Sequence, residues 1–178
     1  MLAMAGYVLM AIAGAISLIW KMKVAEVAMK CAAPIGAALT FLALVTGSIW
    51  GKPTWGTWWV WDARITSVLV LFFLYTGVIA LNEAFENRQA AVKACAVLSL
   101  VGVVNIPIIY YSVQWWNTLH QGASVSFSKA PTMAATMLVG MLLMALAFWM
   151  YSIAVVLVRV RVIILERERN ADWVREHI

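Results

Sequence analysis

Long apolar segments separated by short polar ones run through the chain from its first residues to about position 158. Each has about the 17 to 25 residues that a helix needs to cross a ~30 Å hydrocarbon core. The five segments cover residues 2–20, 32–50, 65–81, 92–113 and 134–158. Because lipid offers the backbone no hydrogen-bond partners, this pattern predicts an all-α, polytopic membrane bundle with five transmembrane helices.

The polar segments are too short to form a separate domain, so we expect a single membrane domain over residues 1–178. Three of them are longer than a turn: an outer loop at 51–64, a second outer loop at 115–132 and a cytoplasmic tail at 159–178. The alternating charges of "ERERNADWVREH" in the tail are typical of a solvated helix.

Composition and charge agree with a membrane protein and give an orientation. Apolar residues make up 65% of the chain and charged residues 12%, and the mean hydropathy is +0.90. One predicted side holds Lys21, Lys23, Lys30, Arg88, Lys93, Arg159, Arg161, Arg167, Arg169 and Arg175, and the other holds Lys52, Arg64 and Lys129. The positive-inside rule therefore places the C-terminus in the cytoplasm. Basic anchors facing anionic lipid explain the net charge of +5 without a nucleic-acid partner.

This orientation places Met1 outside, although no charged n-region or cleavage site precedes the first helix. A first helix that enters from the outside usually follows another span. We therefore expect a further helix upstream of Met1, the alternative being a genuine five-helix protein.

Little in the chain supports catalysis. Cys31 and Cys95 belong to no CxxC or CxxCH motif, which indicates two small core residues rather than thiol exchange. The only histidines, His120 and His177, fall on opposite predicted sides of the membrane. Neither a Ser-His-Asp order nor paired carboxylates are present, so we expect a protein that is not an enzyme.

The stretch "WGTWWVWDARITS", residues 55–67, combines four tryptophans with an Asp and an Arg. If Pro53 opens a short helix, three indoles and a carboxylate share one face. These are Trp55, Trp58, Trp59 and Asp62. Trp61 then projects elsewhere and Arg64 lies nearly opposite Trp55, so Asp62 and Arg64 should each meet another partner.

Aromatic residues are unevenly divided between the two predicted surfaces. Trp50, Trp55, Trp58, Trp59, Trp61, Trp115 and Trp116 are outer, with Tyr110 and Tyr111 nearby, whereas Trp20 and Trp173 are inner. An interfacial aromatic belt should be two-sided. The asymmetry favours a flat, polarizable ligand at the outer surface, and a lopsided belt remains the alternative.

The second outer piece, "NIPIIYYSVQWWNTLHQG", follows an apolar run that begins near Val92. If the helix persists to Gln121, its length of about 30 residues, or ~45 Å, exceeds the bilayer core. Its end must then project outward or bend at Pro107. Gly122 suits a helix C-cap, which would place His120 in the last turn with Trp116 on the same face.

His120 at the outer surface is either a metal ligand or a hydrogen-bonded surface residue. Together with the indoles it matches the needs of haem, whose plane can lie on tryptophans and whose iron accepts imidazole. Arg64 or Lys52 could meet a propionate. Met133 could supply a second axial ligand only if the last helix begins near the site.

These motifs resemble a known family. The WWD stretch resembles the tryptophan-rich signature of a superfamily of haem-handling proteins. "APIGAALTFLALVTGSIWGKPTWGTWWVWDARITS", followed by "NIPIIYYSVQWWNTLHQG", resembles the haem exporter protein C family of system I cytochrome c maturation. The similarity runs from about Lys21 through Gln121 and more loosely to the tail.

The resemblance implies an inner-membrane protein of six helices that transports haem b as a transient cargo in cytochrome c biogenesis. It implies presentation at the periplasmic face to a haem chaperone, assisted by a small membrane subunit and an ATP-binding cassette transporter. Residues that carry over to the WWD platform are Trp55, Gly56, Trp58, Trp59, Trp61, Asp62 and Arg64. His120 carries over as the second axial ligand of the haem iron, and the first would lie before Met1.

The same residues are also compatible with two other functions. A structural membrane subunit would use the WWD segment as an interfacial anchor and docking surface without binding haem. A quinone-binding oxidoreductase subunit would need a second redox centre, for which the chain offers no candidate.

Overall fold

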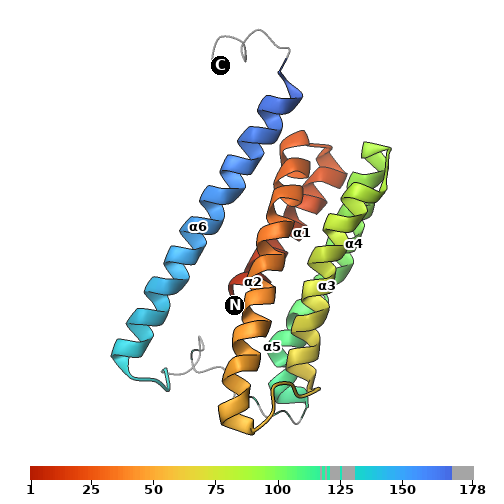
Figure 1. The fold of residues 1–178 in the computed structure, drawn as a ribbon. Coiled ribbons are helices and arrows are strands. Elements are labelled where there is room, and N and C mark those ends of the chain that lie inside the picture. Colours follow the sequence, from red (N-terminus) through yellow and green to blue (C-terminus); the bar gives the residue numbers. More distant parts are fainter. Residues whose placement is uncertain (117, 119, 121–124, 126–130, 170–178) are drawn as a thin grey trace.

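The computed structural model describes residues 1–116, 118, 120, 125 and 131–169, and in these ranges every regular element is a helix. The helices are α1 (Leu2–Trp20), α2 (Lys23–Trp55), α3 (Ala63–Ala84), α4 (Arg88–Gly102), α5 (Asn105–Trp115) and α6 (Ala135–Arg167). Figure 1 shows α1 to α5 packed as an up-and-down bundle, with α6 alongside α2. Because α4 and α5 follow one another as a single span, the described residues contain five helices that can cross a membrane. The prediction of an all-α bundle with five spans is confirmed.

Helix α2 is much longer than the predicted segment 32–50. It begins at Lys23, and at its far end the predicted loop residues 51–55 are helical, with Pro53 inside the last turn. The helix ends at Gly56, whose φ of 78° is a left-handed conformation that suits glycine, and whose N–H donates to the Lys52 carbonyl at 3.0 Å. At ~1.5 Å per residue α2 is about 50 Å long, so one of its ends must extend beyond a ~30 Å hydrocarbon core.

The span formed by α4 and α5 is interrupted after Gly102, close to the expected bend at Pro107. Proline has no N–H, so Val103 loses its usual helical donor, and the Ile106 N–H donates to the Val103 carbonyl instead, at 2.9 Å. The expected extension of this helix to Gln121 is wrong, because α5 ends at Trp115 and Trp116 is extended. The proposed C-cap, Gly122, lies outside the described residues.

The core of the bundle is built around two tyrosines and several small residues. The rings of Tyr7 and Tyr75 meet edge to face, with centroids 5.0 Å apart. Their hydroxyls donate to backbone carbonyls of other helices, Tyr75 to Ala3 at 2.7 Å and Tyr7 to Leu98 at 3.3 Å. A Cβ at Gly36 would collide with the Tyr75 ring, so glycine permits the close approach of α2 and α3.

The two cysteines are part of this core region. Cys31 and Cys95 are buried and form no disulfide, as expected of small core residues.

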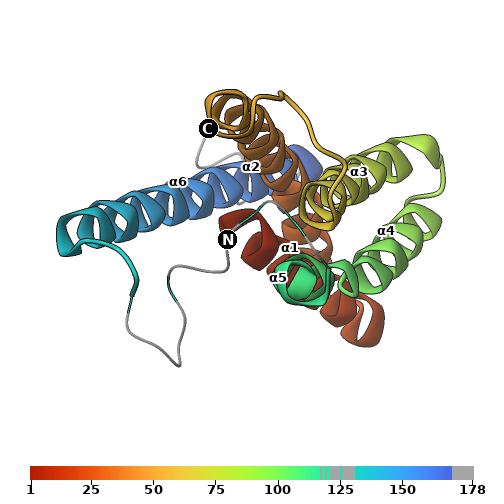
Figure 2. The same ribbon diagram turned by 90° about the horizontal axis from the view of Figure 1, so that it is seen from below.

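Of the six described helices, α6 packs least closely against the rest of the bundle. It contributes no buried residue, and Figures 1 and 2 show its first turns well apart from the end of α2. It also continues beyond the predicted segment 134–158 to Arg167, so the first part of the predicted tail 159–178 belongs to this helix. The remainder, residues 170–178, lies outside the described residues.

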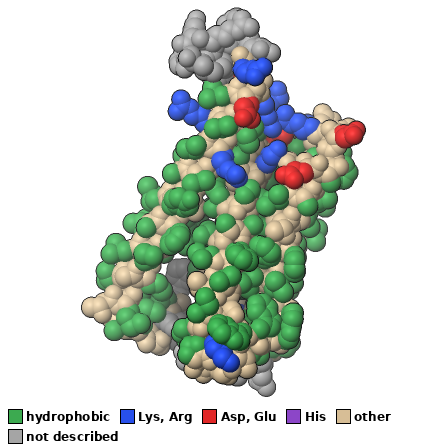
Figure 3. Space-filling model, viewed as in Figure 1, with side chains coloured by type: hydrophobic (Ala, Val, Ile, Leu, Met, Phe, Trp, Pro, Cys, Tyr) green, Lys and Arg blue, Asp and Glu red, His purple; other side chains and the backbone are tan. Residues whose placement is uncertain are grey.

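The two ends of the bundle differ in charge. In Figure 3 the basic side chains gather around the end where α6 finishes. The described basic residues of the connections and helix ends there are Lys21, Lys23, Lys30, Arg88, Lys93, Arg159, Arg161, Arg167 and Arg169. Lys52 and Arg64 lie at the other end, close to the tryptophan-rich segment.

Candidate functional site

The segment between α2 and α3, residues 56–62, is an irregular loop. Gly56 terminates α2, and Asp62 caps α3 by accepting the Ile65 N–H on Oδ1 at 2.8 Å. The prediction of a short helix that begins at Pro53 is therefore wrong. The prediction that Trp55, Trp58, Trp59 and Asp62 share one face of that helix is wrong for the same reason. The physical reason is that Pro53 joins the preceding helix, and the Asp62 side chain starts a new one.

Asp62 also reaches the one histidine that the structure describes. Its Oδ2 lies 2.6 Å from Nδ1 of His120, and its side chain is only 5% exposed. The expectation that Asp62 finds a partner other than Arg64 is met by this contact. The placement of His120 in a last helical turn beside Trp116 is wrong, because α5 has already ended at Trp115.

The contact with Asp62 determines which nitrogen of His120 remains for other chemistry. An ionised carboxylate is only an acceptor, so Nδ1–H donates to Oδ2. In a neutral imidazole bound in this way, the lone pair available to a metal lies on Nε2. Metal-binding histidines are commonly held in this way, with a carboxylate on the other nitrogen fixing the tautomer and the ring orientation. The His120 side chain is 21% exposed, so the imidazole is held but still accessible.

Trp55, in the last turn of α2, holds the imidazole from a second direction. The two ring centroids are 4.7 Å apart with an interplanar angle of 67°. Trp50 in turn packs on Trp55, with centroids 5.2 Å apart at 84°. Trp50 is not among the residues that the motif assigns to the site. Trp50 lies five residues before Trp55 on the same helix. The sequence would have predicted its contact with Trp55 only if α2 had been expected to continue through Pro53.

The remaining tryptophans of the loop divide into exposed and covered rings. Trp58 is 58% exposed and Trp61 is 75% exposed, whereas Trp59 is half-buried against Trp61, with centroids 5.5 Å apart. The Trp59 indole nitrogen is buried and has no hydrogen-bond partner in the part of the chain that the structure describes. Buried donors are normally paired, so this N–H is suited to an acceptor on a bound molecule.

Polar contacts fix the loop against α2. Ser48 donates to the Trp58 carbonyl at 2.7 Å, and Lys52 Nζ donates to the Gly56 carbonyl at 3.0 Å. Lys52 Nζ also lies 5.9 Å from the centroid of the Trp58 ring. Arg64 is half-buried in the first turn of α3.

A second group of aromatic rings lies at the end of α5. Tyr111 stacks on Trp115 with centroids 5.3 Å apart at 19°, and Trp116 meets Trp115 edge to face. Figures 1 and 2 show the start of α6 apart from the end of α2, which lends no support to Met133 as a ligand.

Comparison with known proteins shows that the chain is similar to members of one family. The family model described as heme exporter protein C matches residues 1–175. The Heme exporter protein C of Escherichia coli strain K12 is 53% identical over 97% of this chain and 69% of its own length. That of Haemophilus influenzae is 51% identical over 93% of this chain and 68% of its own length. The protein of the same name from Bradyrhizobium diazoefficiens is 51% identical over 89% of this chain and 60% of its own length. This multi-pass membrane chain therefore belongs to the heme exporter protein C family.

Proposed function

We propose that this protein holds haem as a transient cargo at its tryptophan-rich end during cytochrome c maturation, with Nε2 of His120 as an axial ligand of the iron. The observation that carries the proposal is the 2.6 Å contact between His120 and the buried carboxylate of Asp62, beside exposed indoles. The names of the relatives associate those proteins with haem export.

The residues fit haem in three respects. His120 offers a nitrogen ligand whose ring is oriented by Asp62 and Trp55. The exposed rings of Trp58 and Trp61 provide flat apolar surface for a macrocycle. The Trp59 N–H, which no other described residue pairs with, provides a buried donor.

Lys52 is the favoured partner for a propionate. Its ammonium has three donors, of which one goes to the Gly56 carbonyl, and it lies beside the Trp58 ring. Gly56 allows the chain to turn from α2 into the loop, which brings Trp58 back against Ser48 of that helix. Trp55 and Asp62 therefore position the ligand, and Trp58, Trp59 and Trp61 surround the cargo. Arg64, in the first turn of α3, remains a second candidate for a propionate.

The charge distribution and the family support a biological setting for this proposal. With the basic end in the cytoplasm of an inner-membrane protein, the tryptophan-rich end faces the periplasm. The cargo would be haem b, presented to a periplasmic haem chaperone with help from a small membrane subunit and an ATP-binding cassette transporter. The protein would act by binding and release, without chemistry on the porphyrin ring.

The test is the visible absorption spectrum of the purified protein after addition of haem. Changing His120→Ala should shift the haem bands and weaken haem retention, because the imidazole ligand is lost. His177→Ala, at the chain's other histidine, is the matched control and should leave the spectrum unchanged. Identical spectra for His120→Ala and the unaltered protein would refute the ligand assignment.

A structural role is the alternative that a specific observation favours. Trp58, Trp61, Trp115 and Trp116 are all exposed, as tryptophans of an interfacial belt would be. In that case Trp58→Ala combined with Trp61→Ala would weaken assembly with partner subunits and leave haem binding unchanged. The same double variant should lower haem retention if these rings surround the cargo.

A further inference from the structure

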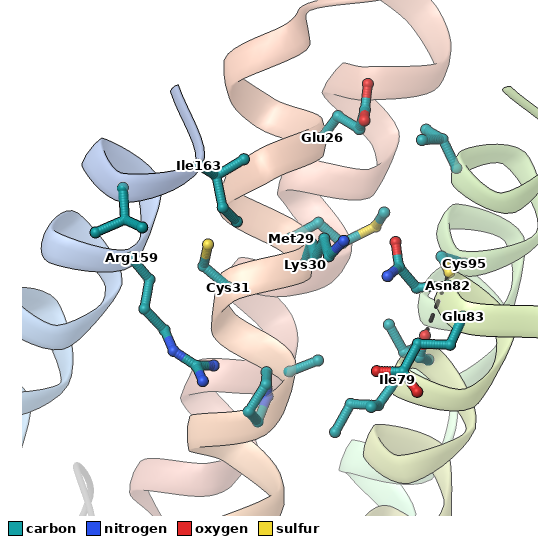
Figure 4. Close-up of a pocket in the computed structure, with 15 residues that line it drawn as sticks. Glu26, Met29, Lys30, Cys31, Ile79, Asn82, Glu83, Cys95, Arg159 and Ile163 are labelled. Carbon is teal, nitrogen blue, oxygen red and sulfur yellow. Dashed lines mark hydrogen bonds between the residues drawn. The ribbon is translucent and has the colours of Figure 1, made fainter. Parts of the chain in front are cut away.

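A cavity of about 340 Å³ lies at the end of the bundle opposite the tryptophans. Figure 4 shows Lys30 and Cys31 on α2, Asn82 and Glu83 on α3, and Arg159 on α6 around it. The haem site proposed above uses none of these residues.

Two of its cations are available to a ligand. Lys30 and Arg159 are exposed and make no hydrogen bond or ion pair with any other described residue. Glu26, which also lines the cavity, is paired with Arg88 at 2.8 Å and with Arg167 at 3.3 Å. Its charge is therefore largely offset, and Lys30 and Arg159 can bind an anion.

The opposite wall has a different chemistry. Asn82 and Glu83 belong to α3, and in Figure 4 they lie across the cavity from Arg159. Both carry oxygen acceptors, so this wall suits hydroxyl donors and disfavours a second negative charge. A ligand that matches both walls has one phosphate group and neighbouring hydroxyls.

The rest of the lining is apolar, including Met29, Val78, Ile79, Val162 and Ile163. Lys30 lies seven residues after the start of α2, which is about 10 Å along the helix axis. At that depth a headgroup can meet Lys30 and Arg159 while its acyl chains remain in the hydrocarbon. Basic pockets between helices on the cytoplasmic side of membrane proteins are suited to such headgroups.

The geometry points to a binding site for the phosphodiester headgroup of an anionic phospholipid with free hydroxyls, such as phosphatidylglycerol. The phosphate lies between Lys30 of α2 and Arg159 of α6, and the hydroxyls face Asn82 and Glu83. Helix α6 buries no residue of its own, and the ion pair of Arg167 with Glu26 links it to α2. The bound phosphate adds a second link between the same two helices.

The experiment measures lipid binding to the purified full chain in neutral detergent by native mass spectrometry. The probes are phosphatidylglycerol and phosphatidylcholine with identical acyl chains. Each basic side chain near a membrane surface contributes about fivefold to affinity, so we expect phosphatidylglycerol to bind roughly tenfold or more tightly than phosphatidylcholine. The double variant Lys30→Gln/Arg159→Gln should remove this preference, whereas Lys30→Arg/Arg159→Lys should retain most of it.

The matched control changes the same two helices. Lys23→Gln/Arg161→Gln removes equal charge from α2 and α6 at exposed positions that do not line the cavity, and it should keep the preference. An equal loss in the control would overturn the site, because it would show that diffuse surface charge binds the lipid. Inorganic phosphate competes for the same cations without acyl chains. Displacement of the lipid at equimolar phosphate would overturn the lipid assignment in favour of a free anion.

Discussion

The two ends of the bundle handle charge in opposite ways. At the tryptophan-rich end the Asp62 side chain is 5% exposed and holds His120 among aromatic rings. At the basic end Glu26 is 18% exposed and Arg88 is 52% exposed, so their pair is in contact with solvent. Buried polar contacts are strong and orient their partners, whereas exposed ion pairs contribute little. The first arrangement is suited to a ligand of fixed geometry, and the second to the anionic surface of a membrane.

The largest effect that separates the two ends is expected from Asp62→Asn. The amide keeps an oxygen for the Ile65 N–H but can donate to Nδ1 of His120, which would place the ring proton on Nε2. Loss of such an orienting partner lowers metal affinity by roughly 10- to 100-fold, and haem titration should show a decrease of that order. Glu26→Gln, the same chemical change at the other end, should leave haem affinity unchanged. Equal affinities for Asp62→Asn and the unaltered protein would mean that the carboxylate does not act through His120.

The second-largest effect is expected at Gly56, where α2 turns into the loop of residues 56–62. Gly56→Ala puts a side chain at φ 78°, which should cost about 1–2 kcal/mol of stability. Gly47→Ala is the control, since an added Cβ there meets no atom within 4 Å and α2 continues through the position. Thermal unfolding followed by tryptophan fluorescence should show a lower midpoint for Gly56→Ala alone. Similar midpoints for both variants would contradict the assigned turn.

A smaller effect should come from the buried indole N–H of the loop. Trp59→Phe removes a donor that has no partner among the described residues, so the stability of the haem-free protein should change little. If the N–H binds the cargo, haem affinity should fall by an amount equivalent to a net hydrogen bond, about 0.5–1.5 kcal/mol. Trp61→Phe, at a ring that is 75% exposed, keeps the aromatic surface and is the control. The idea fails if both variants bind haem as the unaltered protein does.

The smallest effect is expected at the basic end. Glu26→Gln removes ion pairs with Arg88 and Arg167, and for such exposed pairs the loss should be at most about 1 kcal/mol. The loss should shrink as salt is raised, because salt screens the interaction. Midpoints of thermal unfolding at low and high salt would measure it, with the exposed Glu86→Gln as the control. A loss that is independent of salt would indicate a buried role for Glu26.

Several features of the fold were predictable from local sequence. Apolar length alone identified the five spans, and Pro107 indicated the interruption between α4 and α5. Helix ends were less predictable. Pro53 reads as a helix start because its missing N–H costs least in a first turn. In the structure it lies in the last turn of α2, which the Gly56 N–H closes by donating to the Lys52 carbonyl.

The candidate site was only partly predictable, because it depends on contacts between residues far apart in the chain. The motif identified Trp55, Asp62 and His120, but not that they touch one another. A contact between residues 58 positions apart in the chain depends on where α2 ends, where α3 begins and how α5 packs against α3. No local pattern carries that information.

The sequence by itself determined that this chain spans a membrane, which of its ends is basic and which is aromatic, and which residue types could bind haem. These properties follow from composition and spacing, since burial of apolar helices in lipid depends on each segment alone. The tertiary structure decided that Asp62 orients His120, that Trp58 and Trp61 stay exposed, and that Lys30 and Arg159 line one cavity. These relations depend on how separate helices pack together, and packing is a property of the whole chain.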